Sequence, residues 1–197
     1  LFYSFGPKPR GGGIYISDCC DSASATVTIS GNLIQNNLDT GGIYIASPNT
    51  YTVASSHAIT GNIIINNSSV NRGGGLHLSN SYATVVRNNV IAGNFAKSSA
   101  GGMYLALSSS RGPHSATIQN NVISGNVAPQ YAAVEAAVDS TATFSNNTVT
   151  QNRSTAAGSA AIRLGGAVAS FLDAVPIYCG YRWLQCCHFG LHLAGAY

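Results

Sequence analysis

The chain has few charged residues, only 8% of its 197 positions, although 45% of the positions are hydrophobic. Intrinsic disorder requires the opposite balance, low hydrophobicity with high net charge, so the sequence predicts a folded chain. The nine lysines and arginines form no basic run and leave a net charge of only +3, which argues against nucleic acid as a partner. No uninterrupted apolar stretch reaches the length of about 20 residues that a bilayer requires, so we expect no membrane span.

Acidic residues are scarcer still. The six are Asp18, Asp21, Asp39, Glu135, Asp139 and Asp173. A calcium site needs several carboxylates around one ion, and a glycoside hydrolase needs two across the scissile bond. Only Asp18 and Asp21 form a close acidic pair in the sequence. We therefore expect no metal site and no cofactor, and a hydrolase is disfavoured.

The five cysteines fall into two distant groups, Cys19-Cys20 and Cys179 with Cys186-Cys187. If the repeats described below stack about 4.8 Å apart, the groups lie on the order of 24 Å apart, too far for a disulfide. A local bridge from Cys179 to Cys186 or Cys187 and unpaired cysteines are both open. The spacing does not match a zinc site.

What the sequence does contain is a motif that returns five times, Asn-x-(Ile/Val)-x-x-Asn. Its first asparagines are Asn32, Asn62, Asn89, Asn121 and Asn147, and its second are Asn37, Asn67, Asn94, Asn126 and Asn152. A small-residue pair followed by an apolar residue recurs in step with it, and the apolar residues are Ile14, Ile43, Leu76, Met103, Val134 and Ile162. A strand-rich repeat of roughly 30 residues predicts a solenoid.

Each repeat begins with a strand whose inward positions are all apolar, such as Ile43 and Ile45 or Leu76 and Leu78. A register slip of one residue would expose this whole set, so the register is firmly specified. Asparagine suits sharp corners because it tolerates left-handed backbone and bonds its neighbours. Stacked once per turn, the two asparagine sets predict two ladders of side-chain amides. We expect His57 to be packed and His114 to be solvated.

The glycine-pair strands, the N-x-I-x-x-N corners and the nearly constant step between repeats resemble the parallel β-helix repeats of the pectate-lyase-like superfamily, with bacterial secreted and surface proteins as the nearest likeness. The resemblance implies an all-β, right-handed parallel β-helix of about five to six rungs, located outside the cell or on its surface. It divides the chain into residues 1–10, a truncated lead-in; residues 11–166, the repeats; and residues 167–197, a divergent Cys- and aromatic-containing tail. The tail is either an apolar cap or docking segment, or a non-native stretch such as a shifted reading frame.

One outward residue lies between the two inward residues of each first strand. These residues are Tyr15, Tyr44, His77, Tyr104, Glu135 and Arg163, and the register predicts a single file about 4.8 Å apart. Aromatic faces suit the apolar faces of sugar rings, and the superfamily commonly places its polysaccharide groove along this sheet. We therefore predict carbohydrate binding by Tyr15, Tyr44, His77 and Tyr104. The alternative is that stacked rings only stabilise neighbouring strands. Glu135 and Arg163 are expected to form a surface ion pair.

The preferred function is a secreted or surface scaffold, or adhesin-like module, that contacts a polysaccharide or cell-surface glycan and neighbouring domains of a longer chain. The alternative is a carbohydrate-active enzyme, a polysaccharide lyase before a glycoside hydrolase. A purely structural spacer between other domains is the third possibility. A lyase of this superfamily would use a basic residue to take a proton beside a uronate carboxylate. Arg72, His77 and Lys97 are the candidates, and the sequence places them on the third and fourth repeats.

Overall fold

The computed structural model describes residues 12–17, 26–46, 56–79, 83–107, 114–137, 140–164, 168–172 and 177–178. The predictions for all five cysteines, for residues 1–10 and for residues 179–197 fall outside this part of the chain, as do Asp18, Asp21, Asp139 and Asp173. The described residues form strands and turns with no helix. No helix among them could therefore reach across a bilayer.

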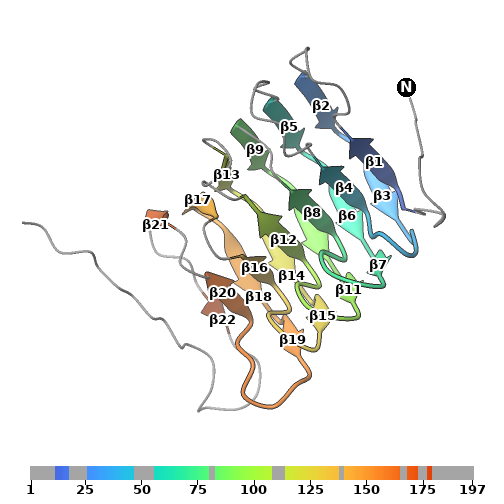
Figure 1. The fold of residues 1–197 in the computed structure, drawn as a ribbon, viewed down its shortest axis with the longest axis vertical. Helices are drawn as coiled ribbons and strands as arrows, with labels where there is room; N and C mark the ends of the chain where they lie inside the picture. The colour runs from blue at the N-terminus through green and yellow to red at the C-terminus, as the bar shows by residue number, and fades with distance from the viewer. Residues whose placement is uncertain are drawn as a thin grey trace, which may run out of the picture.

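The strands form four parallel sheets that run along one axis (Figure 1). Sheet A contains β1 (Ile14–Ser17), β4 (Ile43–Ala46), β8 (Leu76–Ser79), β12 (Met103–Ala106), β16 (Val134–Ala136) and β20 (Ile162–Leu164). Sheet B contains β2 (Thr26–Ser30), β5 (Ser56–Thr60), β9 (Ala83–Arg87), β13 (Ser115–Gln119), β17 (Thr141–Ser145) and β21 (Val168–Leu172).

Sheet C contains β3 (Leu33–Gln35), β6 (Ile63–Ile65), β10 (Val90–Ala92), β14 (Val122–Ser124), β18 (Thr148–Thr150) and β22 (Ile177–Tyr178). Sheet D is shorter and contains β7 (Ser68–Ser69), β11 (Phe95–Ala96), β15 (Val127–Ala128) and β19 (Arg153–Ser154). Each strand pairs with the equivalent strand of the next turn, so the chain visits the four sheets in order and returns to the first. This is a parallel β-solenoid, as predicted.

The number of turns differs slightly from the predicted five to six rungs. Four turns contain a strand of every sheet, beginning at β4, β8, β12 and β16. The first and last turns lack a strand in sheet D. Parallel pairing continues through β21 and β22, which join β17 and β18, so the stack extends beyond residue 166 to Tyr178.

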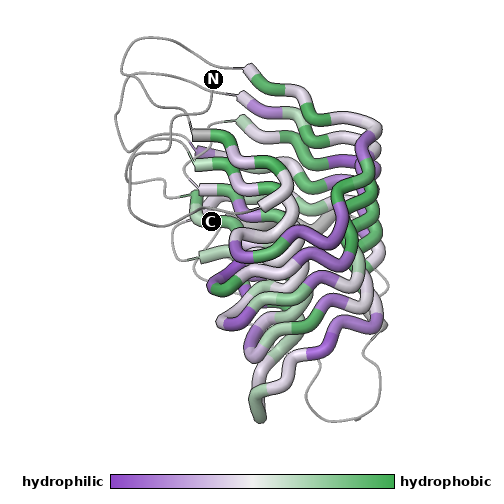
Figure 2. The backbone as a smooth tube through the Cα atoms, turned by 90° about the vertical axis from the view of Figure 1, so that its right-hand side faces the viewer, coloured by the Kyte–Doolittle hydropathy of each residue, from purple (hydrophilic) through white to green (hydrophobic). Residues whose placement is uncertain are grey.

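The core lies inside the turns, and its residues recur at the same places in successive turns. The sheet A pairs Ile43 and Ile45, Leu76 and Leu78, and Met103 and Leu105 are fully buried. Their equivalents in the terminal turns, such as Ile14 and Leu164, are partly buried and pack against the same core. Figure 2 shows the turns stacked above one another, with apolar and polar positions alternating along the strands.

The two asparagine ladders form as predicted. The Oδ1 atom of Asn89 accepts hydrogen bonds from the backbone N and the Nδ2 of Asn62, at 2.9 and 3.0 Å. The Nδ2 of Asn89 donates to Oδ1 of Asn121 and to the backbone carbonyl of Ile59. The second ladder repeats this arrangement through Asn67, Asn94 and Asn126. The ladders therefore satisfy buried polar groups at two corners of each interior turn.

The left-handed backbone lies one residue earlier than the asparagine argument placed it. Positive φ occurs at the residue before each ladder position. Before the first ladder these residues are Gly31, Gly61, Asn88, Asn120 and Asn146; before the second they are Asn36, Asn66, Gly93, Gly125 and Gln151. Two adjacent residues thus form each corner: the first has the left-handed backbone that makes the bend, and the ladder asparagine after it forms hydrogen bonds to the neighbouring turns.

Candidate functional site: the outer file of sheet A

Parallel pairing in sheet A aligns the six outward residues in one file. Tyr15 pairs with Tyr44, Tyr44 with His77, and His77 with Tyr104. The register continues from Tyr104 to Glu135 and from Glu135 to Arg163. The predicted file therefore exists, and its two halves differ in chemistry: four aromatic residues are followed by an acid and a base.

In the aromatic half, the rings contact one another along the solenoid axis. The ring centroids of Tyr15 and Tyr44 lie 5.3 Å apart in a stacked arrangement. Tyr44 and His77 lie 4.3 Å apart with tilted planes, and His77 meets Tyr104 edge-on at 4.8 Å. Aromatic pairs at these separations contribute to stability beyond their buried area. Tyr15, Tyr44 and His77 are partly buried, whereas Tyr104 is buried.

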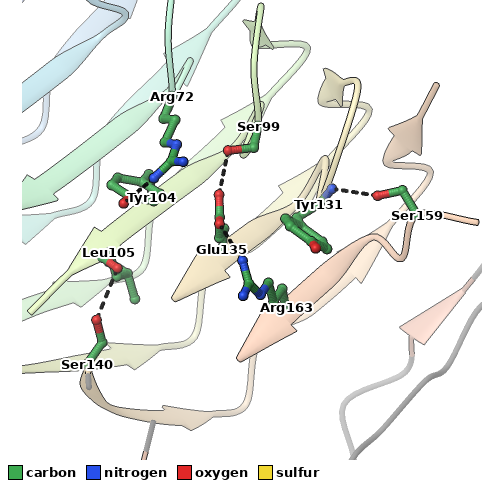
Figure 3. Close-up of polar contacts among 9 residues, drawn as sticks. All are labelled: Arg72, Ser99, Tyr104, Leu105, Tyr131, Glu135, Ser140, Ser159 and Arg163. Carbon is green, nitrogen blue, oxygen red and sulfur yellow. Dashed lines mark hydrogen bonds and ion pairs between the residues drawn. The ribbon is translucent and has the colours of Figure 1, made fainter. Parts of the chain in front are cut away.

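Arg72 lies over the end of this aromatic row. Its Nη1 donates a hydrogen bond of 2.7 Å to the hydroxyl of Tyr104, and its guanidinium carbon lies 5.0 Å from the centre of that ring (Figure 3). The backbone carbonyl of Arg72 lies 3.4 Å from Nδ1 of His77. A carbonyl can only accept, so this contact is a hydrogen bond in the tautomer that carries its proton on Nδ1.

Burial lowers the pKa of His77 from 6.5 to about 4. The hydrogen bond to the carbonyl of Arg72 opposes this shift, and the positive charge of Arg72 adds to it. His77 is consequently neutral at pH 7, and its imidazole packs as one more aromatic ring in the row. The structure thus brings Arg72, His77 and Tyr104 together.

Lys97 is the third basic residue selected from the sequence. It is exposed directly after β11, and its backbone N–H bonds the carbonyl of Ser69. Within the described part of the chain no hydrogen bond joins its side chain to Arg72 or His77. Of the three basic residues selected from the sequence, the structure brings Arg72 and His77 into contact.

The second half of the file surrounds a buried carboxylate. Glu135 accepts a hydrogen bond from the Ser99 hydroxyl and pairs with Arg163 at 3.2 Å (Figure 3). The side chain of Glu135 is 4% exposed and that of Arg163 is 42% exposed. The predicted ion pair is present, but only the arginine lies at the surface. Arg163 also lies 5.3 Å from the ring centre of Tyr131.

Ser99 and Tyr131 were not predicted from the sequence as part of this site, because neither lies on a strand of sheet A. A signal for Ser99 was nevertheless available: like Arg72, it lies just before a small-residue segment that leads into a sheet A strand. The structure pairs Arg72 with Ser99 and Ser99 with Gln130 in parallel bridges. The residues that precede sheet A thus form a second file beside the first, and they supply its polar partners.

The two other described histidines are both buried. His57 lies inward on β5 at 2% exposure, as expected. His114 was expected to be solvated, and that prediction is wrong: it is 3% exposed immediately before β13. Across the described ranges, no three His, Cys, Asp or Glu side chains are grouped closely enough to hold a metal ion.

These contacts make the outer file largely self-contained. Ring faces meet other rings, the Tyr104 hydroxyl accepts from Arg72, and the Glu135 carboxylate has two partners. Tyr15, Tyr44 and His77 are partly exposed, and the side chain of Arg163 is the other exposed part of the file. This arrangement can stabilise adjacent turns, and it can present polar edges to a ligand.

Comparison with known proteins agrees with the observed fold. No curated protein and no solved structure matches the chain significantly. The family model described as a right-handed β-helix region matches residues 8–170. That match covers every complete turn of the solenoid, and it supplies the handedness that periodicity alone does not give. This chain belongs to the right-handed β-helix family.

Proposed function

We propose that the chain is a rigid scaffold module of a secreted or cell-surface protein. The observation that carries this proposal is the self-contained outer file, in which Arg72, Tyr104, Ser99, Glu135 and Arg163 use their polar groups on one another. In a substrate-binding site, we would expect some of these polar groups to lack a partner within the protein, so that they could bind the substrate. The low charge and a composition rich in asparagine, serine and threonine support a role outside the cell.

Glycan contact is a second candidate, favoured by the partial exposure of three adjacent rings. Tyr15, Tyr44 and His77 form a row of ring edges in which phenol hydroxyls could bond sugar hydroxyls. Face-on stacking of sugars is less favoured, because neighbouring rings cover one another. A lyase has the least support, because His77 is a weak base at pH 7 and Arg72 is engaged with Tyr104.

Size-exclusion of neutral and acidic polysaccharides incubated with the purified chain separates the three functions. The scaffold predicts polymers of unchanged length and protein that elutes alone. Co-elution of the protein with a polymer would instead indicate a glycan-binding module. In that case Tyr44→Ala should abolish the co-elution, and Val70→Ala should not. Shortened polymer would establish an enzyme.

The proposed location needs its own test. An antibody raised against the chain should label intact cells of the source organism, or detect the protein in the medium, without permeabilisation. Labelling only after permeabilisation would contradict a secreted or surface role.

A further inference from the structure

Four asparagines of the chain begin the sequence Asn-x-(Ser/Thr), in which x is not proline. They are Asn66, Asn67, Asn146 and Asn152. In a protein that enters a secretory pathway, this sequence is the acceptor for N-linked glycans. The four motifs are alike in sequence, so the folded structure has to distinguish the asparagines that can carry a glycan from those that cannot.

Two of the four are ladder asparagines, and the fold uses the amide hydrogens of both. Asn67 is 1% exposed, and its Nδ2 donates to the carbonyl of Ile34 and to Oδ1 of Asn94. The Nδ2 of Asn152 donates to two backbone carbonyls. A glycan replaces one of these hydrogens and needs space around the nitrogen. A chain glycosylated at Asn67 or Asn152 therefore cannot complete the ladder at that turn.

The other two asparagines occupy the bend of a corner, directly before a ladder asparagine. Asn66 lies between β6 and β7, and Asn146 lies between β17 and β18 (Figure 1). Both have left-handed backbone, with φ of 55° and 53°, and both are exposed. Within the described residues, no hydrogen bond engages either side-chain amide. A glycan on either nitrogen would project into solvent without breaking a bond of the solenoid.

We propose that Asn66 and Asn146 are N-glycosylation sites of this chain and that Asn67 and Asn152 are not. The proposal rests on the secreted or cell-surface location proposed above, because the glycan donor is a lipid-linked oligosaccharide of the secretory pathway. In the transfer, Nδ2 of the asparagine forms a bond to C1 of the first sugar and loses one proton. The bond from C1 to the lipid pyrophosphate breaks, and the pyrophosphate keeps the electron pair. The glycans would add hydration to a chain that has few charges.

The repeat offers a corner at which an acceptor can be created. Asn36 has the same exposed, left-handed backbone as Asn66, but Leu38 follows it where Ser68 follows Asn66. Leu38 is 65% exposed, so Leu38→Thr should leave the fold intact. If the bend position is what makes an acceptor, this variant should gain a glycan at Asn36.

A ladder position provides the matched control. Ala96→Ser creates the same acceptor sequence at Asn94, which is buried. The residue that pairs with Ala96 in the preceding turn is already a serine, Ser69, so the solenoid tolerates this side chain there. Ala96→Ser should gain no glycan.

The test is secretion of the full 197-residue chain from a eukaryotic host behind a signal peptide. A glycan amidase acting in heavy-oxygen water converts each glycosylated asparagine to a labelled aspartate, which peptide mass spectrometry locates. We expect label at Asn66 and Asn146 and none at Asn67 or Asn152. Asn66→Gln and Asn146→Gln should each remove one glycan, and circular dichroism should show an unchanged fold.

Several results would overturn the proposal. Secreted, folded chain without label at Asn66 or Asn146 is one, and label at Asn67 or Asn152 is another. A glycan at Asn94 in the Ala96→Ser variant, or none at Asn36 in Leu38→Thr, would show that corner geometry does not select the acceptors. The proposed location fails separately, if the antibody test finds the native protein only inside cells, because the host experiment examines the acceptors alone.

Discussion

Each buried ladder asparagine uses its full hydrogen-bonding capacity. For Asn94, Oδ1 accepts from the backbone N and the Nδ2 of Asn67, and Nδ2 donates to the carbonyl of Ile64 and to Oδ1 of Asn126. Removing such a side chain leaves several buried groups without partners, which is more costly than losing one bond between exposed groups. Position along the ladder should therefore decide the effect of an otherwise identical substitution.

Asn94→Ala should lower the free energy of unfolding by at least about 3 kcal/mol, because donors and an acceptor on both neighbouring turns lose their partners. Asn32→Ala is the matched control: Asn32 is an exposed ladder residue of the first turn, and its loss should cost about 1 kcal/mol or less. Urea unfolding followed by circular dichroism measures both. Equal losses would mean that the amides act locally and not as a ladder.

His77 gives the stability of the solenoid a pH dependence. The unfolded chain binds a proton at this residue with a pKa near 6.5, and the folded chain with a pKa of about 4. Above pH 6.5 neither state is protonated, so stability is full. As the pH falls from 6.5 toward 4, the unfolded state binds more protons and the free energy of unfolding decreases, by up to about 3 kcal/mol, then levels off.

The His77→Tyr variant should lose this dependence, since tyrosine occupies the neighbouring positions of the file and does not titrate there. Urea midpoints between pH 7.5 and pH 5.5 give the comparison, and this window avoids most carboxylate titration. If the urea midpoint fell equally with pH in the unmodified chain and in the His77→Tyr variant, another titratable group would be responsible for the pH dependence.

At the scale of the element, the start of the sheet A strand β4 is set by close approach between turns. A Cβ atom added at Gly42 would lie 2.8 Å from the carbonyl oxygen of Gly75, 2.8 Å from Cγ2 of Ile64 and 2.9 Å from Nδ2 of Asn67. One of these atoms is backbone, so the strand itself would have to move. Gly42 therefore serves the spacing between turns and not turn formation.

Gly42→Ala should cost about 1–3 kcal/mol through this overpacking. Gly61→Asn is the matched control, because Gly61 has a φ of +64° with open space around it, and Asn88 and Asn120 already occupy the equivalent corner. Gly61→Asn should change the free energy of unfolding by no more than about 0.5 kcal/mol. Thermal unfolding of the two variants measures both changes in stability. A large loss of stability in Gly61→Asn would contradict the conclusion that the residue before each ladder asparagine only makes the bend.

Local patterns predicted the strands well because each rung repeats the same constraints. Alternation fixed the inward residues of sheet A, and the asparagine spacing fixed both ladders. The pattern did not reveal that the turning residue is Asn88 rather than Asn89, since both are asparagines. Nor did it reveal the burial of Glu135 and His114, which depends on segments that pack beside the strands. The contact of Ser99 with Glu135 joins residues 36 positions apart, beyond the reach of any local rule.

At the scale of the whole molecule, stability should vary along the axis. Each turn contacts only its neighbours, so interior turns are held on both sides and terminal turns mainly on one. Hydrogen exchange read by mass spectrometry should show the slowest amides in β8 to β15 and faster exchange toward β1 and β20. Uniform protection along the chain would instead indicate a single cooperative unit with no end effects.

The ladders also determine where this chain can change in length. From the last inward residue of sheet B to the second ladder asparagine, every complete motif has the same spacing, as from Ile29 to Asn37 or from Ile118 to Asn126. Between sheets A and B the spacing is unequal, because the connection from Ile43 to Ile59 is clearly longer than the equivalent one from Leu76 to Val86. One side of the solenoid is a fixed-length frame, and the other accepts insertions. A foreign peptide grafted between the sheet A and sheet B strands should leave every hydrogen bond of the asparagine ladders in place. This connection is therefore where new binding loops could arise.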